Sequence, residues 1–456
     1  MADKYKTPSE QELQSATEIV RLILVDVDKN CNKWWNGYVL KNGDFYCEYG
    51  RVQDAKGDCR HDYYERKDLK GKSASDHLAT KVKEKNRKGY VEQRVTAAVG
   101  APAARTSSTG KAIANHDLKA VATREIKGDN ETRKLVGWLA EVNIHNITQS
   151  TNISYDVATG SFTTPLGTLV TPDGLVEARD LLTSLQPYVQ DREWEDAAYK
   201  RLLGQYLQII PQDVGRGRDW HTTVLAGGTA IREQNDIIDA LETALTTSAK
   251  TVDGKKAKDA PAGSATFNVT LDVVSDNKII SGIKKKYREE KGSHYDVRDY
   301  DVRRAWTVNI TTVREAFQAQ GVPIGNVKQL WHGTRCSHLL SILKGGLVIP
   351  RSSAPHVCGR LFGDGVYFSD QSTKSIRYAT GAWQGSGNTE RVFMFIADVA
   401  LGKSYKPRGY QHGSFRIPAG YNSCFAEGGV SGVQNNEFIV YNTYQCDLTY
   451  LVEFSK

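Results

Sequence analysis

The sequence lacks the features that would place the chain in a membrane or build it around a metal. Its 456 residues hold no apolar run long enough to span a bilayer, and the polar start MADKYKTPSEQELQSATEIV has no signal-peptide core. The seven cysteines include no C-x-x-C pair, and an odd, scattered count is typical of reduced thiols rather than of a disulfide framework. We therefore predict an intracellular protein with no structural metal and no membrane partner.

An extreme charge balance is also missing. The formal net charge of +7 permits nucleic-acid binding without requiring it. At about 150 residues for each domain, the length suggests roughly three domains. Two stretches rich in small and polar residues, TAAVGAPAARTSSTGKA and KTVDGKKAKDAPAGSAT, are typical of linkers. The predicted order is a polar tail (1–18), a first domain (19–95), a linker (96–130), a second domain (131–248), a short linker (249–264) and a third domain (265–456).

The three domains differ in their hydrophobic patterns, which together predict a multidomain α+β protein. The first has aromatic, strand-like segments, KWWNGYVL and DFYCEYGRVQ, and then a charged helical stretch, so it is a small α+β domain. The second repeats apolar residues at helical spacing, as in the stretch after Thr171-Pro172, and is predicted to be an all-α bundle. The third alternates, as in ATFNVTLDVV, and is predicted to be mainly antiparallel and rich in strands.

A single acidic residue stands out in the last strand-like segment, NNEFIVY. With period two, Glu437 shares a face with Ile439 and Tyr441, where an apolar core is expected. One interpretation is a solvated strand start, and the other is a functional carboxylate. In the first domain, Lys81, Lys85 and Lys88 recur at helical spacing and form either a basic stripe or an ordinary solvated face.

Three fragments of the third domain, LWHGTR, FGDGVYFSDQSTKSIRY and NNEF, gain meaning from their order. Together they resemble the catalytic domain of the poly(ADP-ribose) polymerases. The second domain resembles the helical regulatory domain of the DNA-dependent members, in TPLGTLVTPDGLVEARDLL and YLQIIPQDVG. The first resembles their WGR domain, in NKWWNGYVL, YGRV and EKNRKGY. The resemblance implies an ADP-ribosyltransferase that uses NAD+ as its substrate and needs no metal.

The resemblance implies catalytic roles for Glu437, His332 and Tyr367. Cleavage of the nicotinamide N-glycosidic bond develops positive charge on the ribose, as in glycosidases. The carboxylate of Glu437 would stabilise that charge and orient the incoming hydroxyl. His332 would hydrogen-bond the ribose hydroxyls, and Tyr367 would pack beside the site.

NAD-binding roles follow from the same resemblance. Gly333 would give the nicotinamide amide two backbone hydrogen bonds, because no side chain blocks the approach. Ser375 would add a hydroxyl contact to the amide, and Tyr378 would stack on the ring, with Tyr367 closing the aromatic pocket beside His332.

The WGR-like part carries the predicted DNA contacts, but departs from the family at Tyr49, where tryptophan is usual. Tyr49 would stack on a DNA end, and Arg51 would contact backbone or phosphate. The stripe of Lys81, Lys85 and Lys88 would add binding that does not depend on sequence. Two further departures lie near the NAD site. Asp364 stands where lysine is common, and Val348 where an adenosine-contacting arginine is frequent, with Arg351 as a candidate substitute.

The resulting hypothesis is an NAD+ ADP-ribosyltransferase that DNA breaks activate and that modifies protein acceptors, including itself, in the response to DNA damage. In the family, the helical domain obstructs the NAD site until DNA binding loosens it. Two alternatives stay open: a mono-ADP-ribosyltransferase of the same fold, and a DNA-end-binding scaffold with an inactive transferase domain. A nuclear location is expected if the source is eukaryotic.

Overall fold

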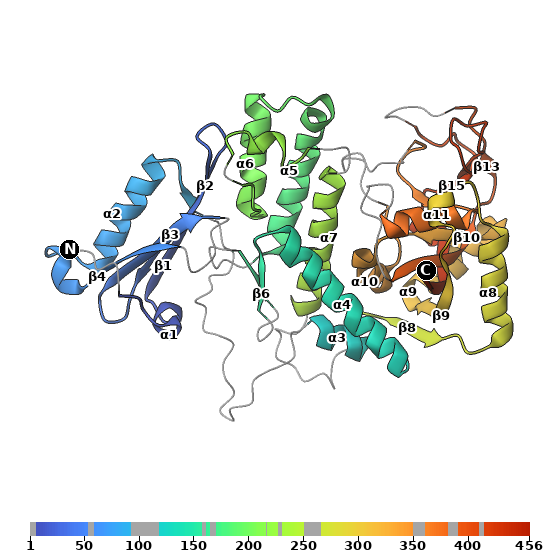
Figure 1. Cartoon of the computed structure of the whole chain (residues 1–456), viewed down its shortest axis with the longest axis horizontal. Coiled ribbons are helices and arrows are strands. Elements are labelled where there is room, and N and C mark those ends of the chain that lie inside the picture. Colours follow the sequence, from blue (N-terminus) through green and yellow to red (C-terminus); the bar gives the residue numbers. More distant parts are fainter. Residues whose placement is uncertain are drawn as a thin grey trace. The chain divides into compact units, whose positions relative to one another are not determined.

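The computed structural model describes residues 6–52, 59–92, 118–156, 161–164, 170–215, 217–226, 230–249, 266–349, 361–381, 391–409 and 415–456. They belong to two compact units. Figure 1 shows their helices and strands, coloured along the chain. The first contains Met1–Asp117 and Ile147–Leu245, and the second contains Leu118–Asn146 and Thr246–Lys456. This grouping differs from the three predicted domains, whose boundaries remain a prediction. In the described part of the chain, no helix is both long and apolar enough to cross a bilayer.

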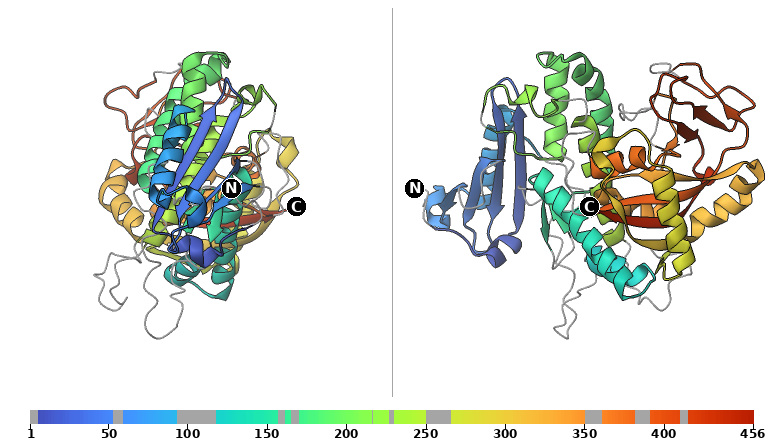
Figure 2. Two further views of the ribbon diagram at one scale, coloured as in Figure 1. Left: turned by 90° about the vertical axis from the view of Figure 1, so that its left-hand side faces the viewer. Right: turned by 45° about the vertical axis from the view of Figure 1, so that its right-hand side comes forward.

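The first unit contains an antiparallel sheet in the order β4-β3-β2-β1-β5, covered on one face by helix α2 (Figure 2). Alternation buries Trp35, Phe45 and Cys47 against Leu78 of the helix. The side chain of Ser73 caps α2 by accepting a hydrogen bond from the backbone of Asp76. The elements are α1 (Glu10–Gln14), β1 (Glu18–Asp26), β2 (Cys31–Val39), β3 (Phe45–Arg51), β4 (Arg60–Tyr64), the 3-10 helix η2 (Arg66–Leu69), α2 (Ala74–Arg87) and β5 (Val91–Glu92).

Helices of the predicted bundle belong to the same unit as this sheet. The indole of Trp220 donates to Asn30 at 3.0 Å, and the amide of Asn32 donates to the carbonyl of Gln212 at 3.3 Å. The predicted helix start is confirmed, because Thr171 caps α5 and Pro172 is its first residue. The elements are β6 (Ser154–Asp156), β7 (Ser161–Thr163), α5 (Pro172–Asp191), α6 (Ala197–Ile209), η3 (Trp220–Thr222) and α7 (Ala230–Ala249), whose last residues belong to the second unit.

The second unit contains two sheets. The larger has the order β10-β12-β16-β9-β8 and is antiparallel, and the smaller has the order β11-β15-β14-β13 with one parallel pair. Its core gathers around Trp331, Met394 and Val452. The strands are β8 (Val269–Val273), β9 (Asp301–Ile310), β10 (Val327–Gly333), β11 (Val366–Phe368), β12 (Val392–Ala400), β13 (Ser404–Tyr405), β14 (Ser423–Ala426), β15 (Glu437–Val440) and β16 (Cys446–Ser455). The helices are α8 (Asn277–Glu289), η4 (Tyr295–Val297), α9 (Thr311–Ala316), η5 (Phe317–Gly321), η6 (Val322–Ile324), α10 (Cys336–Gly345), α11 (Ser372–Thr380) and η8 (Thr443–Gln445).

Helix α3 (Leu118–Glu125) lies inside the stretch 96–130 that was predicted as a linker. Its apolar residues Leu118, Val121 and Ala122 recur at helical spacing and are buried. Helix α4 (Asn130–Ser150) begins in the second unit, where the hydroxyl of Thr132 donates to the carbonyl of Leu271 at 3.0 Å. The start of the predicted helical domain therefore packs with the strands of the third domain.

Candidate active site

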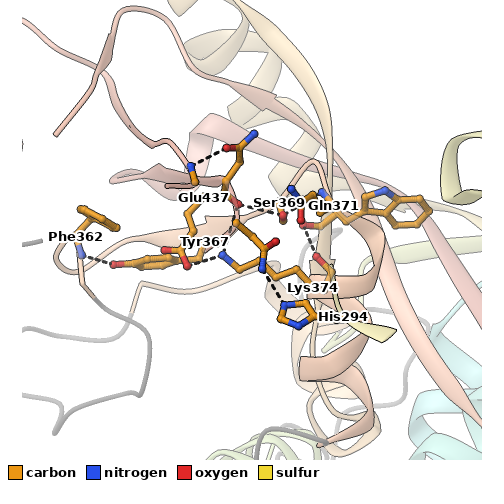
Figure 3. Close-up of polar contacts among 12 residues, drawn as sticks. His294, Phe362, Tyr367, Ser369, Gln371, Lys374 and Glu437 are labelled. Carbon is orange, nitrogen blue, oxygen red and sulfur yellow. Dashed lines mark hydrogen bonds and ion pairs between the residues drawn. The ribbon is translucent and has the colours of Figure 1, made fainter. Parts of the chain in front are cut away.

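The three motif fragments meet where the two sheets of the second unit join. The backbone N–H of Trp331 in β10 donates to the carbonyl of Ser369 at 2.9 Å, and the N–H of Ser369 donates back at 3.0 Å. Strand β11 lies antiparallel to β15, with Tyr367 opposite Ile439. Figure 3 shows the resulting cluster, with Glu437 and Lys374 pointing toward one another.

Glu437 is buried, with 7% of its surface exposed, so the interpretation as a solvated strand start is wrong. Its Oε1 forms an ion pair with Nζ of Lys374 at 2.5 Å. Its Oε2 is buried and has no hydrogen-bond partner among the described residues. Burial lowers the pKa of Lys374, and the facing carboxylate opposes that shift. One oxygen of the acid is thus neutralised, while the other remains able to accept a hydrogen bond.

His332 and Tyr367 are held by backbone groups. Nδ1 of His332 lies 3.0 Å from the carbonyl of Tyr367, which only accepts, so this nitrogen carries the proton. Burial lowers the pKa of His332, which favours the neutral ring with Nε2 as an acceptor. The hydroxyl of Tyr367 donates to the carbonyl of Gly363 at 2.9 Å and accepts from the N–H of Phe362 at 3.1 Å. Tyr367 therefore fixes the glycine-rich loop.

Gly333 is required by the close approach of β10 to α11. A Cβ atom built on Gly333 would lie 1.7 Å from the carbonyl oxygen of Ser375, which no side chain could tolerate. The buried hydroxyl of Ser375 lies 3.4 Å from the carbonyl of Trp331. Tyr378, one turn further along α11, is half-buried. The structure thus brings the predicted nicotinamide-binding residues together from two neighbouring elements.

The part of the chain that forms most of this site matches a known protein family. Residues 277–428 match the model of the "Poly(ADP-ribose) polymerase catalytic domain". The poly [ADP-ribose] polymerase-like protein 100L of invertebrate iridescent virus 6 is 36% identical over 135 residues, covering 28% of this chain and 70% of the viral protein. The chain belongs to the poly(ADP-ribose) polymerase family. Its second unit therefore contains an NAD+ ADP-ribosyltransferase domain.

Other members of the family match shorter shares of their own length. The mouse protein mono-ADP-ribosyltransferase PARP3 is 29% identical over 199 residues, covering 37% of this chain and 36% of the mouse protein. The rice poly [ADP-ribose] polymerase 2-B is 24% identical over 259 residues, covering 56% of this chain and 42% of its own. The matched family domain ends at residue 428, before β15. The placing of Glu437 in the candidate site therefore depends on the geometry described above.

Sequence reasoning missed the polar residues at and around Glu437. Lys374 lies in the same sequence motif as Ser375, but only the folded structure shows that its ammonium contacts Glu437. Asn436 precedes the acid and donates from its amide to Asp370 at 2.9 Å, which fixes the strand start. In the described ranges, no cluster of three or more His, Cys, Asp or Glu side chains could hold a metal ion.

The predicted DNA-binding residues lie on the sheet and helix α2 of the first unit. Nζ of Lys85 lies 5.3 Å from the ring centre of Tyr49, and 5.7 Å and 5.0 Å from those of Trp35 and Tyr90. Burial lowers the pKa of Lys85. Of the five predicted residues, Tyr49 and Lys85 lie in direct contact with one another. Arg51 donates to the carbonyl of Asn30 at 3.2 Å, Lys81 lies 3.7 Å from Glu84, and Lys88 is exposed at the end of α2.

Two of the departures from the family pattern, Val348 and Asp364, lie among the described residues of the second unit. Val348 is 70% exposed, so its side chain takes no part in a packed core. Asp364 lies in the turn before β11, next to Gly363, which the hydroxyl of Tyr367 contacts. Arg351, the candidate substitute, lies outside the described residues.

Proposed function

We propose that the chain cleaves the nicotinamide–ribose bond of NAD+ and transfers ADP-ribose to protein acceptors and growing chains when it is bound to broken DNA. The observation that carries this proposal is the state of Glu437. It is a buried carboxylate with one oxygen paired to Lys374 and the other without a partner in the described structure. Such a carboxylate fits a site where positive charge develops.

The chemistry follows from the surrounding groups. As the glycosidic bond breaks, the ribose takes on oxocarbenium character, which a nearby ionised carboxylate stabilises. The free oxygen of Glu437 can accept a hydrogen bond from a ribose hydroxyl, and Nε2 of the neutral His332 can accept another. Gly333 and Ser375 would bind the nicotinamide amide, and Tyr378 would cover the ring. These residues orient the substrate, and Glu437 stabilises the positive charge that develops on the ribose.

The length of the product is the finer part of the proposal. The presence of Glu437 together with His332 and Tyr367 supports elongation, because an incoming ribose hydroxyl needs a group that orients it. The printed names of the relatives differ on this point: the mouse PARP3 is named a mono-ADP-ribosyltransferase and the rice protein a poly [ADP-ribose] polymerase. Mono-ADP-ribosylation is therefore the second candidate.

Activation by DNA is supported by two sets of contacts. The cluster of Lys85 with three aromatic rings fits a surface for a DNA end, where stacking and a nearby cation act together. The amide of Asn143 in α4 lies 3.4 Å from the carbonyl of Ser337, just after the HGTR motif. A helix that contacts this position gives DNA binding a physical route to the site, as a coupling free energy between two sites.

The test is incubation of the purified chain with labelled NAD+, with and without a nicked duplex. We expect a polymer ladder that strengthens many-fold with DNA, and a Glu437→Gln variant that yields none. Single-unit labelling would support the mono-ADP-ribosyltransferase, and no labelling would support the scaffold. Equal labelling without DNA would refute the activation. Deletion of residues 131–248 is expected to make the activity independent of DNA.

A further inference from the structure

A buried histidine outside the known motifs bridges two parts of the active site. His294 lies in the turn between α8 and η4 and is 6% exposed. Its Nε2 lies 2.9 Å from the side-chain amide of Asn435, and its Nδ1 lies 3.3 Å from Nη1 of Arg377. Figure 3 shows its ring close to Lys374. Arg377 belongs to α11, and Asn435 lies just before β15, which begins at Glu437.

The partners of His294 determine where its proton lies. The guanidinium of Arg377 only donates, so Nδ1 must accept. A neutral ring then carries its proton on Nε2, and the amide oxygen of Asn435 is the group that can accept it. The nitrogen and oxygen of that amide exchange places by a turn about its last bond. In this orientation the amide nitrogen of Asn435 faces the hydroxyl of Ser293, 3.0 Å from the amide, and can donate to it.

The two partners of His294 lie close in sequence to residues of the candidate site. Asn435 lies two residues before Glu437, and Arg377 lies between Ser375 and Tyr378 on α11. The same helix carries Lys374, the ion-pair partner of the carboxylate. We propose that His294 is a positioning residue for ADP-ribose transfer: its neutral ring holds the start of β15 and helix α11 in register, so that Glu437 faces the ribose. This inference rests on the proposed function of Glu437.

The turn that carries His294 is also held by bonds that do not involve the imidazole. The N–H of Gly292 donates to the hydroxyl of Thr373 at 2.8 Å, and the N–H of Ser372 donates to the carbonyl of Glu290 at 2.8 Å. The hydroxyl of Ser372 donates to the carbonyl of Tyr287 at 2.8 Å. Replacing His294 therefore leaves the turn attached to α11, and the loss is confined to the bridge.

The bridge depends on pH. Protonation of His294 would turn Nδ1 into a donor facing the guanidinium of Arg377, and Lys374 adds a second positive charge nearby, while Asp296 partly offsets them. Burial, followed by Arg377 and Lys374, lowers the pKa of His294 in the folded chain. The folded state therefore resists protonation, and the bridge is lost as the solution becomes acidic.

The test compares steady-state kinetics of the full chain with those of His294→Ala and His294→Gln, in the presence of nicked duplex. We expect kcat to fall about tenfold in the alanine variant while KM for NAD+ changes little, because the bonds of Gly292 and Ser372 still hold the helix that carries Ser375. Glutamine can both accept from Arg377 and donate to Asn435, so it should restore much of kcat and remove part of the acidic limb of the pH profile. Tyr295→Ala is the matched control, because Tyr295 follows His294 in the chain and its side chain is 75% exposed.

The outcomes separate this inference from the proposed function. A wild-type chain without transfer activity overturns the proposed function. An active wild type whose His294→Ala variant keeps the same kcat and the same acidic limb overturns the inference alone. NMR titration of labelled histidine gives a reading that does not need activity: Arg377→Met should raise the pKa of His294, and an unchanged pKa contradicts the bridge.

Discussion

Replacing Glu437 by glutamine tests both the stability and the chemistry of the buried ion pair. The change keeps the size of the side chain and removes its charge, which leaves the ammonium of Lys374 buried without its ion-pair partner. Removing one partner of a buried pair costs about 3–5 kcal/mol. The cost has a ceiling, because the lysine can lose its proton, and neutralising an amine of ordinary pKa 10.5 costs about 5 kcal/mol at pH 7.

We expect a loss near the lower end of that range, because the amide oxygen of glutamine still accepts a hydrogen bond from Lys374. A loss of about 3 kcal/mol corresponds to a fall in melting temperature of roughly 6–12 °C for a unit of this size. Scanning calorimetry of the full chain checks it. The variant should still bind NAD+ through Gly333 and Ser375, and it should form no polymer.

A double variant provides the control. Lys374→Met together with Glu437→Gln removes the stranded charge, so it should melt at a higher temperature than Glu437→Gln alone. If the double variant melted at or below the single one, the pair would not carry the stability assigned to it. An unchanged polymer ladder from Glu437→Gln would refute the catalytic role.

Three further changes test other contacts. Gly333→Ala should abolish NAD+ binding in calorimetry, because its Cβ would lie 1.7 Å from the carbonyl of Ser375; retained affinity would contradict the required close approach. Trp138→Ala uncovers the guanidinium of Arg391, 4.4 Å from the ring centre, and should lower the melting temperature through a cation–π loss of about 0.5–2 kcal/mol, with Trp138→Phe intermediate. Lys85→Ala should weaken binding to a nicked duplex and reduce the salt slope by about one, so an unchanged slope argues against a phosphate contact.

Local patterns predicted the elements well. The helix after Thr171 and the strand around Leu271 follow from capping and alternation, which depend on neighbours in sequence. The grouping into units could not be predicted from these local patterns. It depends on contacts between residues far apart in sequence, such as the hydrogen bond from Trp220 to Asn30, which produce no periodic pattern. Helix α3 was missed because it is short and follows a polar stretch.

The candidate site was predicted from motifs only in part. The motif residues Gly333 and Ser375 do come together, and the carboxylate of Glu437 is buried as a functional acid would be. Periodicity alone could not distinguish that burial from a solvated strand end. His294 could not be found at all, since its partners lie 83 and 141 residues away and nothing in its own segment marks it.

The reciprocal bonds between Trp331 and Ser369 have a consequence for how such a protein can diversify. They use only backbone atoms, so no substitution other than proline, which lacks an N–H, removes a donor of either hydrogen bond. The seam between the two sheets can therefore stay in place when the surface loops around it are changed in length or composition. Loops from a relative can therefore be grafted around this seam without moving the strands that carry His332, Tyr367 and Glu437.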